Sequence, residues 1–207
     1  MQRNKEKIDS GPSFIGSWDL ENPDLCKEII NFFEKNKDKQ VQGESVTGLD
    51  LERKNSIDMA IYPAELTLPS HKIFNNYMQH LYECYMDYAE QWPFLKTNFP
   101  KLDIGAFNIQ KYNPGGHFAK VHSERVHITS LHRLFAFMTY LNDDFEGGKT
   151  TFVHHNMDIN PIMGKTLIWP AEWTHAHKGN IVKSGTKYIA TGWIHLPIPS
   201  KLSSKTS

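Results

Sequence analysis

Two histidines and a glutamate lie within the stretch HSERVH, residues 122–127, and their types suggest metal chemistry. His122 and Glu124 are two positions apart, so on a β-strand, where side chains alternate between faces, both would project from one side. An imidazole and a carboxylate can bind the same divalent ion. A third ligand would complete the facial set of two histidines and one carboxylate that binds non-haem ferrous iron and leaves positions open on it.

The third ligand has to come from another part of the chain. The stretch THAHKG, residues 174–179, offers both His175 and His177. On a regular strand these two would share one face, so the coordination rules accept either. A chain with 11 histidines and 23 acidic residues is expected to contain a His-x-Glu pair by chance, so residues 122–124 alone are weak grounds for a metal site.

Short runs rich in β-branched and aromatic residues surround both histidine segments from Lys101 onwards. They are DIGAFNIQKY, HFAKVHSE, LFAFMTYLN, TTFVHH, KTLIWP and KYIATGWIHL. The segments NPGG, NDDFEGG and INPIMG supply turns between them. Strands at this spacing, with no helix between them, are typical of an antiparallel sandwich or jelly roll. Residues 101–197 are therefore predicted to form the β core that positions the site.

Two amphipathic helices are predicted before this core, within residues 1–100. In NPDLCKEIINFFEKNK, Asn22 is the expected N-cap and Pro23 the first helical residue. The longer helix, in SHKIFNNYMQHLYECYMDYAEQWP, is predicted to follow Ser70 as N-cap and to stop before Pro93. Apolar and aromatic residues at helical spacing form a stripe along one face of this helix: Ile73, Tyr77, Leu81 and Tyr85. Such a stripe is more typical of a residue set in the core than of a ligand groove. Residues 41–63 predict a loop that leads into a short strand.

Length and composition indicate one soluble domain, residues 1–207, with a mobile polar tail at 198–207. The 23 Lys and Arg residues balance the 23 Asp and Glu residues. The sequence also has no stripe of basic residues of the kind that follows a phosphate backbone, so nucleic-acid binding is not expected. Cys26 and Cys84 lie in the predicted helices and are expected to be buried free thiols. The charged N-terminus lacks a signal-peptide core and no apolar run is long enough for a membrane span, so a cytoplasmic protein is expected.

The motifs around the histidines resemble a known family when they are taken in order. YNPGG and HSE come first, then Arg133, YLN, GGKTTF, PIMG and finally HKGNIVKSGTK, which ends at Lys187. The iron- and 2-oxoglutarate-dependent dioxygenases of the prolyl 4-hydroxylase type show the same series, with His-x-Asp in place of HSE. The segment from Gln110 to Trp193 therefore resembles this family. The phrase IWPAEWTHAHKG also resembles members encoded by bacteriophages and marine bacteria.

The resemblance implies a double-stranded β-helix, or jelly-roll, core supported by the N-terminal helices. It implies His122, Glu124 and His177 as ligands of Fe(II), since His177 and not His175 has the family spacing to Lys187. Lys187 would hold the distal carboxylate of the co-substrate 2-oxoglutarate, a dianion that needs a fixed cation at its far end. O2 would be the second co-substrate, with ascorbate as an accessory reductant.

The glutamate is a departure from the family, which usually has aspartate at the position of Glu124. One extra methylene moves the carboxylate outward, so the backbone or the iron has to adjust, although an oxygen ligand of the same charge should still serve. The remaining histidines of these segments are expected at the surface or next to the ligands, not among them. They are His117, His127, His154 and His155.

Several further residues are assigned to the co-substrate pocket. By the resemblance, Tyr112, Tyr140 and Thr150 would lie beside 2-oxoglutarate. Thr191 alternates with Lys187 along one predicted strand and should share its cavity. Ordinary core packing is an equal alternative for each tyrosine.

Arg133 and Trp193 are assigned to the substrate entrance by the same resemblance. Trp193 is also expected on the strand face that carries Lys187. Arg133 could equally be a structural ion-pair partner, and Trp193 a core residue.

The reaction implied by the resemblance is hydroxylation of an unactivated C–H bond, with a prolyl residue in a peptide or protein as the substrate. A free amino acid or another small molecule is the alternative for the same chemistry. A catalytically silent jelly roll that binds metal or ligand is the alternative from another class. The loops that would select the substrate carry no recognisable pattern, so the motifs do not decide its identity.

Overall fold

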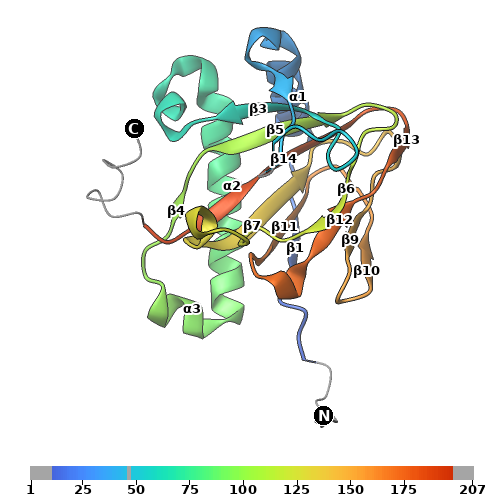
Figure 1. Cartoon of the computed structure of the whole chain (residues 1–207). Helices are drawn as coiled ribbons and strands as arrows, with labels where there is room; N and C mark the ends of the chain where they lie inside the picture. The colour runs from blue at the N-terminus through green and yellow to red at the C-terminus, as the bar shows by residue number, and fades with distance from the viewer. Residues whose placement is uncertain (1–10, 46–47, 198–207) are drawn as a thin grey trace, which may run out of the picture.

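Eight antiparallel strands form the larger sheet of the computed structural model, which describes residues 11–45 and 48–197 (Figure 1). The strand order is β1 (Gly16–Asp19), β11 (Lys165–Pro170), β7 (Arg133–Tyr140), β14 (Lys187–His195), β5 (Phe107–Tyr112), β3 (Ile57–Ile61) and β2 (Val41–Gln42), with β4 (Asp103–Ile104) also paired to β14. Five strand segments expected from the sequence lie in this sheet, and one of them, DIGAFNIQKY, is divided into β4 and β5. Residues 1–10 and the predicted tail at 198–207 lie outside the described residues.

A second, four-stranded sheet faces the larger one. Its order is β10 (Met157–Ile159), β9 (Thr150–Phe152), β12 (His177–Gly179) and β6 (Phe118–His122). A separate pair joins β13 (Val182–Ser184) to β8 (Glu146–Gly147). Two facing antiparallel sheets form the jelly-roll core, and the predicted fold class is confirmed.

Three α-helices occur in the described residues: α1 (Pro23–Lys35), α2 (Lys72–Gln91) and α3 (Pro93–Asn98). As predicted, the Asn22 side chain caps α1 by accepting a hydrogen bond from the Leu25 amide at 3.1 Å. The prediction for the start of α2 was wrong. Ser70 belongs to a single 3₁₀ turn, Pro69–His71, and His71 is the N-cap residue. Other 3₁₀ turns lie at Lys37–Lys39, Pro63–Thr67, Ile128–Ser130 and Trp173–His175.

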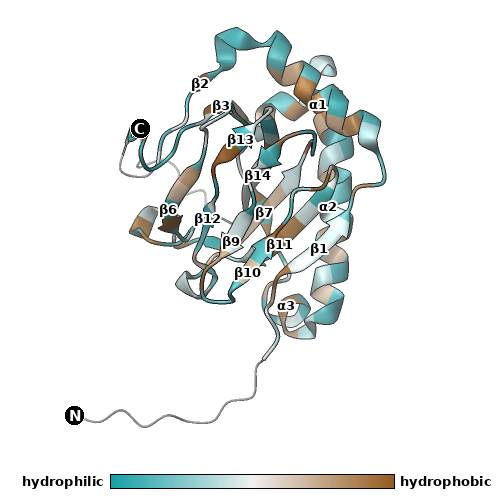
Figure 2. Cartoon of the chain, turned by 90° about the vertical axis from the view of Figure 1, so that its right-hand side faces the viewer, coloured by the Kyte–Doolittle hydropathy of each residue, from teal (hydrophilic) through white to brown (hydrophobic). Residues whose placement is uncertain are grey.

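Helices α1 and α2 cover the outer face of the larger sheet, while the smaller sheet covers its inner face (Figure 2). The alternation along β7 produces both interfaces. Phe135 and Phe137 pack toward the helices, whereas Ala136 and Met138 pack between the sheets. The continuous apolar run of this strand follows from its burial on both faces.

The stripe of α2 is core, as predicted. Tyr77 and Leu81 are fully buried, while Ile73 and Tyr85 are only half-buried. The buried face is completed by Phe74, Cys84 and Tyr88. The hydroxyl of Tyr77 also forms a hydrogen bond with Thr139 of β7 at 2.9 Å, so a polar contact fixes the helix on the sheet.

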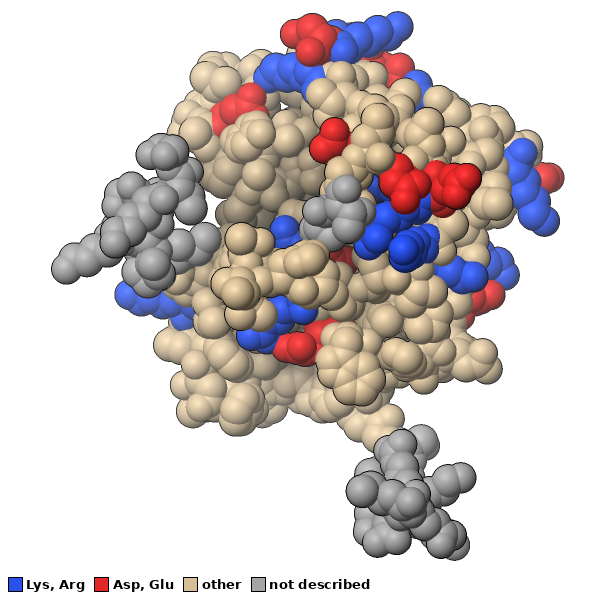
Figure 3. All heavy atoms as spheres, in the orientation of Figure 1, with Lys and Arg blue, Asp and Glu red and all other residues tan. Residues whose placement is uncertain are grey.

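The N-terminal part of the chain supplies strands as well as helices, because β1, β2 and β3 extend the larger sheet. Cys26 and Cys84 are buried free thiols, as expected. In the part of the chain that is described, no helix is long and apolar enough to cross a membrane. On the face shown in Figure 3, basic and acidic side chains are interspersed and do not collect into one basic track.

Candidate metal centre

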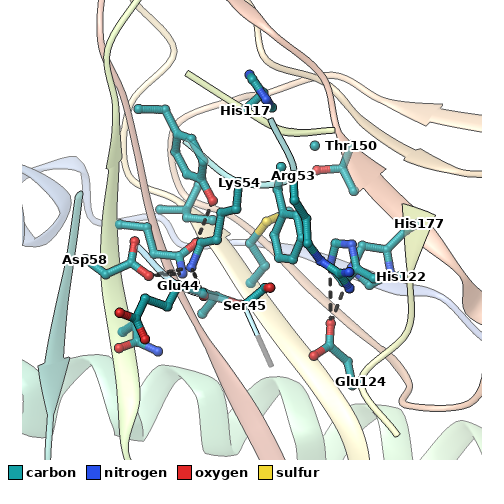
Figure 4. Close-up of a pocket in the computed structure, with 18 of the residues that line it drawn as sticks. Glu44, Ser45, Arg53, Lys54, Asp58, His117, His122, Glu124, Thr150 and His177 are labelled. Atoms are coloured by element: carbon teal, nitrogen blue, oxygen red, sulfur yellow. Dashed lines mark hydrogen bonds and ion pairs between the residues drawn. The ribbon is translucent and has the colours of Figure 1, made fainter. Parts of the chain in front are cut away.

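The three predicted ligands meet at the edge of the smaller sheet (Figure 4). His122 ends β6 and His177 begins β12, and the two residues are paired across the antiparallel ladder. Glu124 lies in a bend just after β6. Its Oε1 is 3.4 Å from His177 Nε2 and 3.9 Å from His122 Nε2. Potential ligand atoms of the three residues all lie within 4.8 Å of one another, and no other such group exists among the described residues.

Backbone hydrogen bonds orient both imidazoles. His122 Nδ1 is 2.8 Å from the Lys120 carbonyl, and His177 Nδ1 is 2.9 Å from the His175 carbonyl. A carbonyl oxygen only accepts, so each Nδ1 is the donor, and each Nε2 faces the centre as the nitrogen available to a metal. In metal-bound histidines, the ring nitrogen that does not bind the metal commonly donates to a carbonyl or carboxylate in the same way.

The electrostatics of the triad suit a divalent ion. Burial, together with the charge of His177, lowers the pKa of His122 to about 4, so this ring is neutral near pH 7. Burial raises the pKa of Glu124, but the hydrogen bond and charge of His177, with smaller contributions from His122 and Trp193, lower it to about 2. The site thus offers an ionised carboxylate beside imidazole nitrogen atoms, the donor set expected for Fe(II).

The competing histidine, His175, faces away from the centre. It lies in a 3₁₀ turn and not on a strand, and its Nε2 donates to the Ser13 carbonyl at 2.8 Å. The four histidines that were expected outside the ligand set also lie outside the triad. His127 and His154 are exposed, and His117 and His155 are half-buried.

A cavity of about 540 Å³ opens from the triad. On one side it reaches Lys187, and on the other it reaches the segment that leads into β3. Of the residues assigned from the sequence, all but one line it: His122, Glu124, His177, Lys187, Tyr112, Thr150, Thr191, Arg133 and Trp193.

Lys187 is a buried lysine at one end of this cavity, with 3% of its surface exposed. Its Nζ donates to the Gly148 carbonyl at 2.7 Å and lies 5.3 Å from the centre of the Tyr112 ring and 5.2 Å from that of Tyr140. Burial lowers the pKa of Lys187 to about 7. Gly148 has φ +63° and a Cβ there would come within 3.1 Å of Lys187 Cδ, so the double glycine gives the lysine its room.

Tyr140 is the one assigned residue that does not line the cavity. It is fully buried, and its hydroxyl forms a hydrogen bond with Thr150 at 2.7 Å. The Tyr112 hydroxyl points to the Gln110 side chain at 2.7 Å. Thr191 donates to the Phe137 carbonyl at 2.9 Å. In this structure Tyr140 supports Lys187 and Thr150 from behind the cavity wall.

Sequence reasoning missed the residues on the far side of the cavity. Lys54 forms a buried ion pair with Asp58 at 2.5 Å, and Gln110 donates to the same carboxylate at 3.0 Å. Next to this pair, Arg53 forms no side-chain hydrogen bond or ion pair with any described residue, and its Nε is buried without a partner. Arg53, Lys54 and Asp58 lie in a segment without periodicity, so no sequence signal marks them.

Comparisons with known proteins agree with this geometry. Residues 107–195 match the 2OG-Fe(II) oxygenase superfamily. Human procollagen-lysine,2-oxoglutarate 5-dioxygenase 2 is 40% identical over 55 residues, which are 26% of this chain but only 8% of that protein. The matched segment is thus a small part of the curated relatives.

Solved structures show the same fold over most of the chain. The viral collagen prolyl hydroxylase of Paramecium Bursaria Chlorella virus-1, in its 2OG complex, has a TM-score of 0.62 and 21% identity, covering 89% of this chain and 97% of that one. A Pseudomonas putida prolyl-4-hydroxylase has a TM-score of 0.66 and 14% identity, covering 90% and 94%. A Trichoplax adhaerens prolyl hydroxylase, solved with a hypoxia inducible factor peptide, has a TM-score of 0.66 and 12% identity, covering 94% and 88%.

The sequence match lies on the strands that carry the triad and Lys187, and the surrounding fold is that of the solved relatives. Residues 107–195 are therefore similar to the 2OG-Fe(II) oxygenase superfamily, in the part of the chain where the potential ligands His122, Glu124 and His177 come together.

Proposed function

We propose that this protein is an Fe(II)- and 2-oxoglutarate-dependent dioxygenase that hydroxylates a prolyl residue in a peptide or protein, with His122, Glu124 and His177 as the iron ligands. The observation that carries the proposal is that the triad and the buried cation Lys187 line one cavity. The bound iron and 2-oxoglutarate would supply the oxidising chemistry: one atom of O2 enters the C–H bond, and the other enters the succinate left when 2-oxoglutarate loses carbon dioxide.

The protein's own part in this reaction is to position and to exclude water. Lys187 would bind the distal carboxylate of 2-oxoglutarate, and Thr150 and Thr191 line the same part of the cavity. Phe118 stacks on the His122 ring with centroids 3.7 Å apart, and Trp169 contacts His177 edge-on at 5.1 Å. These rings keep the ligands in a dry, fixed setting, in which charged contacts are stronger.

The choice of a prolyl substrate is supported by the relatives. Three solved structures with this fold are described as prolyl hydroxylases, and one of them was solved in complex with a peptide. The curated relatives are procollagen-lysine dioxygenases, so a lysyl residue in a peptide is the competing substrate. A cavity of about 540 Å³ accommodates 2-oxoglutarate together with a side chain of either kind.

The substrate class is tested by mass spectrometry. Purified protein is incubated with Fe(II), ascorbate and 2-oxoglutarate, together with prolyl peptides, lysyl peptides or free amino acids. We expect a gain of one oxygen atom on proline in the prolyl peptides, accompanied by succinate. Oxygen found only on lysyl residues or on free amino acids would overturn the prolyl assignment and leave the iron site intact, whereas metal binding without any succinate would favour a silent binding protein.

Arg53 is expected to contact the substrate, because it is the cavity cation that has no partner among the described residues. Losing a hydrogen bond from a charged group to a substrate carbonyl or carboxylate should raise the peptide KM about 10- to 150-fold in Arg53→Ala. The 2-oxoglutarate KM and the iron affinity should stay unchanged. Steady-state succinate assays measure these three quantities in Arg53→Ala and in Arg53→Lys, the charge-preserving control. An unaltered peptide KM in Arg53→Ala would exclude the contact.

A further inference from the structure

Both carboxylate oxygens of Glu124 are occupied in the structure. Oε1 faces the two histidine Nε2 atoms, at 3.4 and 3.9 Å. Oε2 accepts a hydrogen bond from Trp193 Nε1 at 2.7 Å. One oxygen is thus turned toward the metal position while an indole on the larger sheet holds the other.

Arg133 contacts both Trp193 and Glu124. Its guanidinium carbon lies 3.5 Å from the centre of the Trp193 ring, so the two groups are stacked. Its NH1 donates to the main-chain carbonyl of Glu124 at 3.1 Å. Arg133 lies on β7 and Trp193 on the adjacent strand β14, both in the larger sheet. Through these two residues the larger sheet binds the backbone and the side chain of Glu124, which follows β6 of the smaller sheet.

A glutamate needs this support more than an aspartate would. It has one more rotatable bond, so ordering a free glutamate side chain loses more rotamer freedom and opposes metal binding more strongly. A carboxylate shortened by one methylene loses roughly 1.5 Å of reach and cannot keep both contacts from the same backbone position. The hydrogen bond from Trp193 is therefore matched to glutamate.

We infer that Trp193, braced by Arg133, is a positioning residue that lets glutamate act as the carboxylate ligand. The inference rests on the proposed iron site, and it gives Trp193 and Arg133 a role at the metal in addition to the one expected for them at the substrate entrance. Trp193 would act through the Glu124 carboxylate, to which it donates its hydrogen bond.

The test is a double-mutant cycle on metal affinity. Trp193→Phe keeps an aromatic face for Arg133 but removes the indole donor. Co(II) binding is measured by calorimetry and by the absorption bands of the bound ion, without 2-oxoglutarate or substrate. We expect Trp193→Phe to weaken binding roughly 10- to 100-fold, as loss of an outer partner does, and to shift the bands. In a Glu124→Asp background the same change should have little further effect, since the shorter carboxylate has no indole contact to lose.

Trp173→Phe is the matched control, because Trp173 is largely exposed and does not line the cavity. Thermal unfolding of the metal-free variants shows whether each is folded. If Trp193→Phe binds Co(II) as tightly as the unaltered protein does, or loses affinity equally in both backgrounds, the inference is wrong and the iron site stands. If the unaltered protein binds no metal, the proposed iron site fails and the inference fails with it.

Discussion

His177→Ala should abolish iron-dependent turnover of 2-oxoglutarate and weaken metal binding roughly 100-fold or more, beyond what the loss of an outer partner causes. The reason is geometric. His177 is the only ligand on β12, its Nε2 faces Glu124 at 3.4 Å, and its ring is fixed by the His175 carbonyl, so no neighbouring side chain can replace it. Calorimetry with Co(II) and succinate release with Fe(II) measure the two effects.

His175→Ala is the discriminating control for this prediction, since His175 was the competing ligand in the sequence. Its side chain contacts Ser13 and Thr174 and points away from the centre, so its removal should leave metal affinity within a few-fold of normal. His154→Ala, at an exposed position, should change nothing. Loss of metal binding in His175→Ala but not in His177→Ala would show that the ligand assignment is wrong.

The strand pattern singled out residues that the structure brings together, though part of the reasoning was wrong. His122 and Glu124 were expected on one strand face, but β6 ends at His122 and the carboxylate comes from the bend that follows. Likewise, His175 and His177 were expected on one strand, whereas His175 ends a 3₁₀ turn and His177 begins β12, so their side chains point in different directions. Period-two alternation does not show where a strand stops, so only the family spacing distinguished the two histidines.

The elements that the sequence did not show are short or depend on distant partners. β1, β12 and β13 have three or four residues each, too few for a period to appear. The Lys54 and Asp58 pair is held by Gln110, which lies 52 residues from Asp58 in the chain. By contrast, the long buried strands β7 and β14, and the capped helix α1, were evident because their signals are local: apolar runs, turn glycines and an N-cap.

Lys187→Ala should raise the dissociation constant for 2-oxoglutarate by about 30- to 4000-fold, the equivalent of about 2–5 kcal/mol, because the distal carboxylate would be left in a buried pocket without its cation. Metal affinity should not change, since Lys187 is not among the clustered ligands. Titration of 2-oxoglutarate into the metal-loaded protein, read by calorimetry, gives both numbers. Equal affinity in the variant and the unaltered protein would remove Lys187 from the binding site.

The pH dependence of this step is a sharper test, because the pKa of Lys187 in the empty pocket is lowered to about 7 by burial. Below pH 7 the ammonium is present and the dianion binds directly. Above pH 7 the lysine is neutral in the empty protein, so binding has to take up a proton, and the dissociation constant should rise by up to about tenfold per pH unit. Lys187→Arg keeps its charge throughout this range and should give a flat profile, whatever its affinity. A flat profile between pH 6 and 9 in the unaltered protein would mean that Lys187 stays protonated there or does not meet the co-substrate, and comparison with Lys187→Ala separates these two cases.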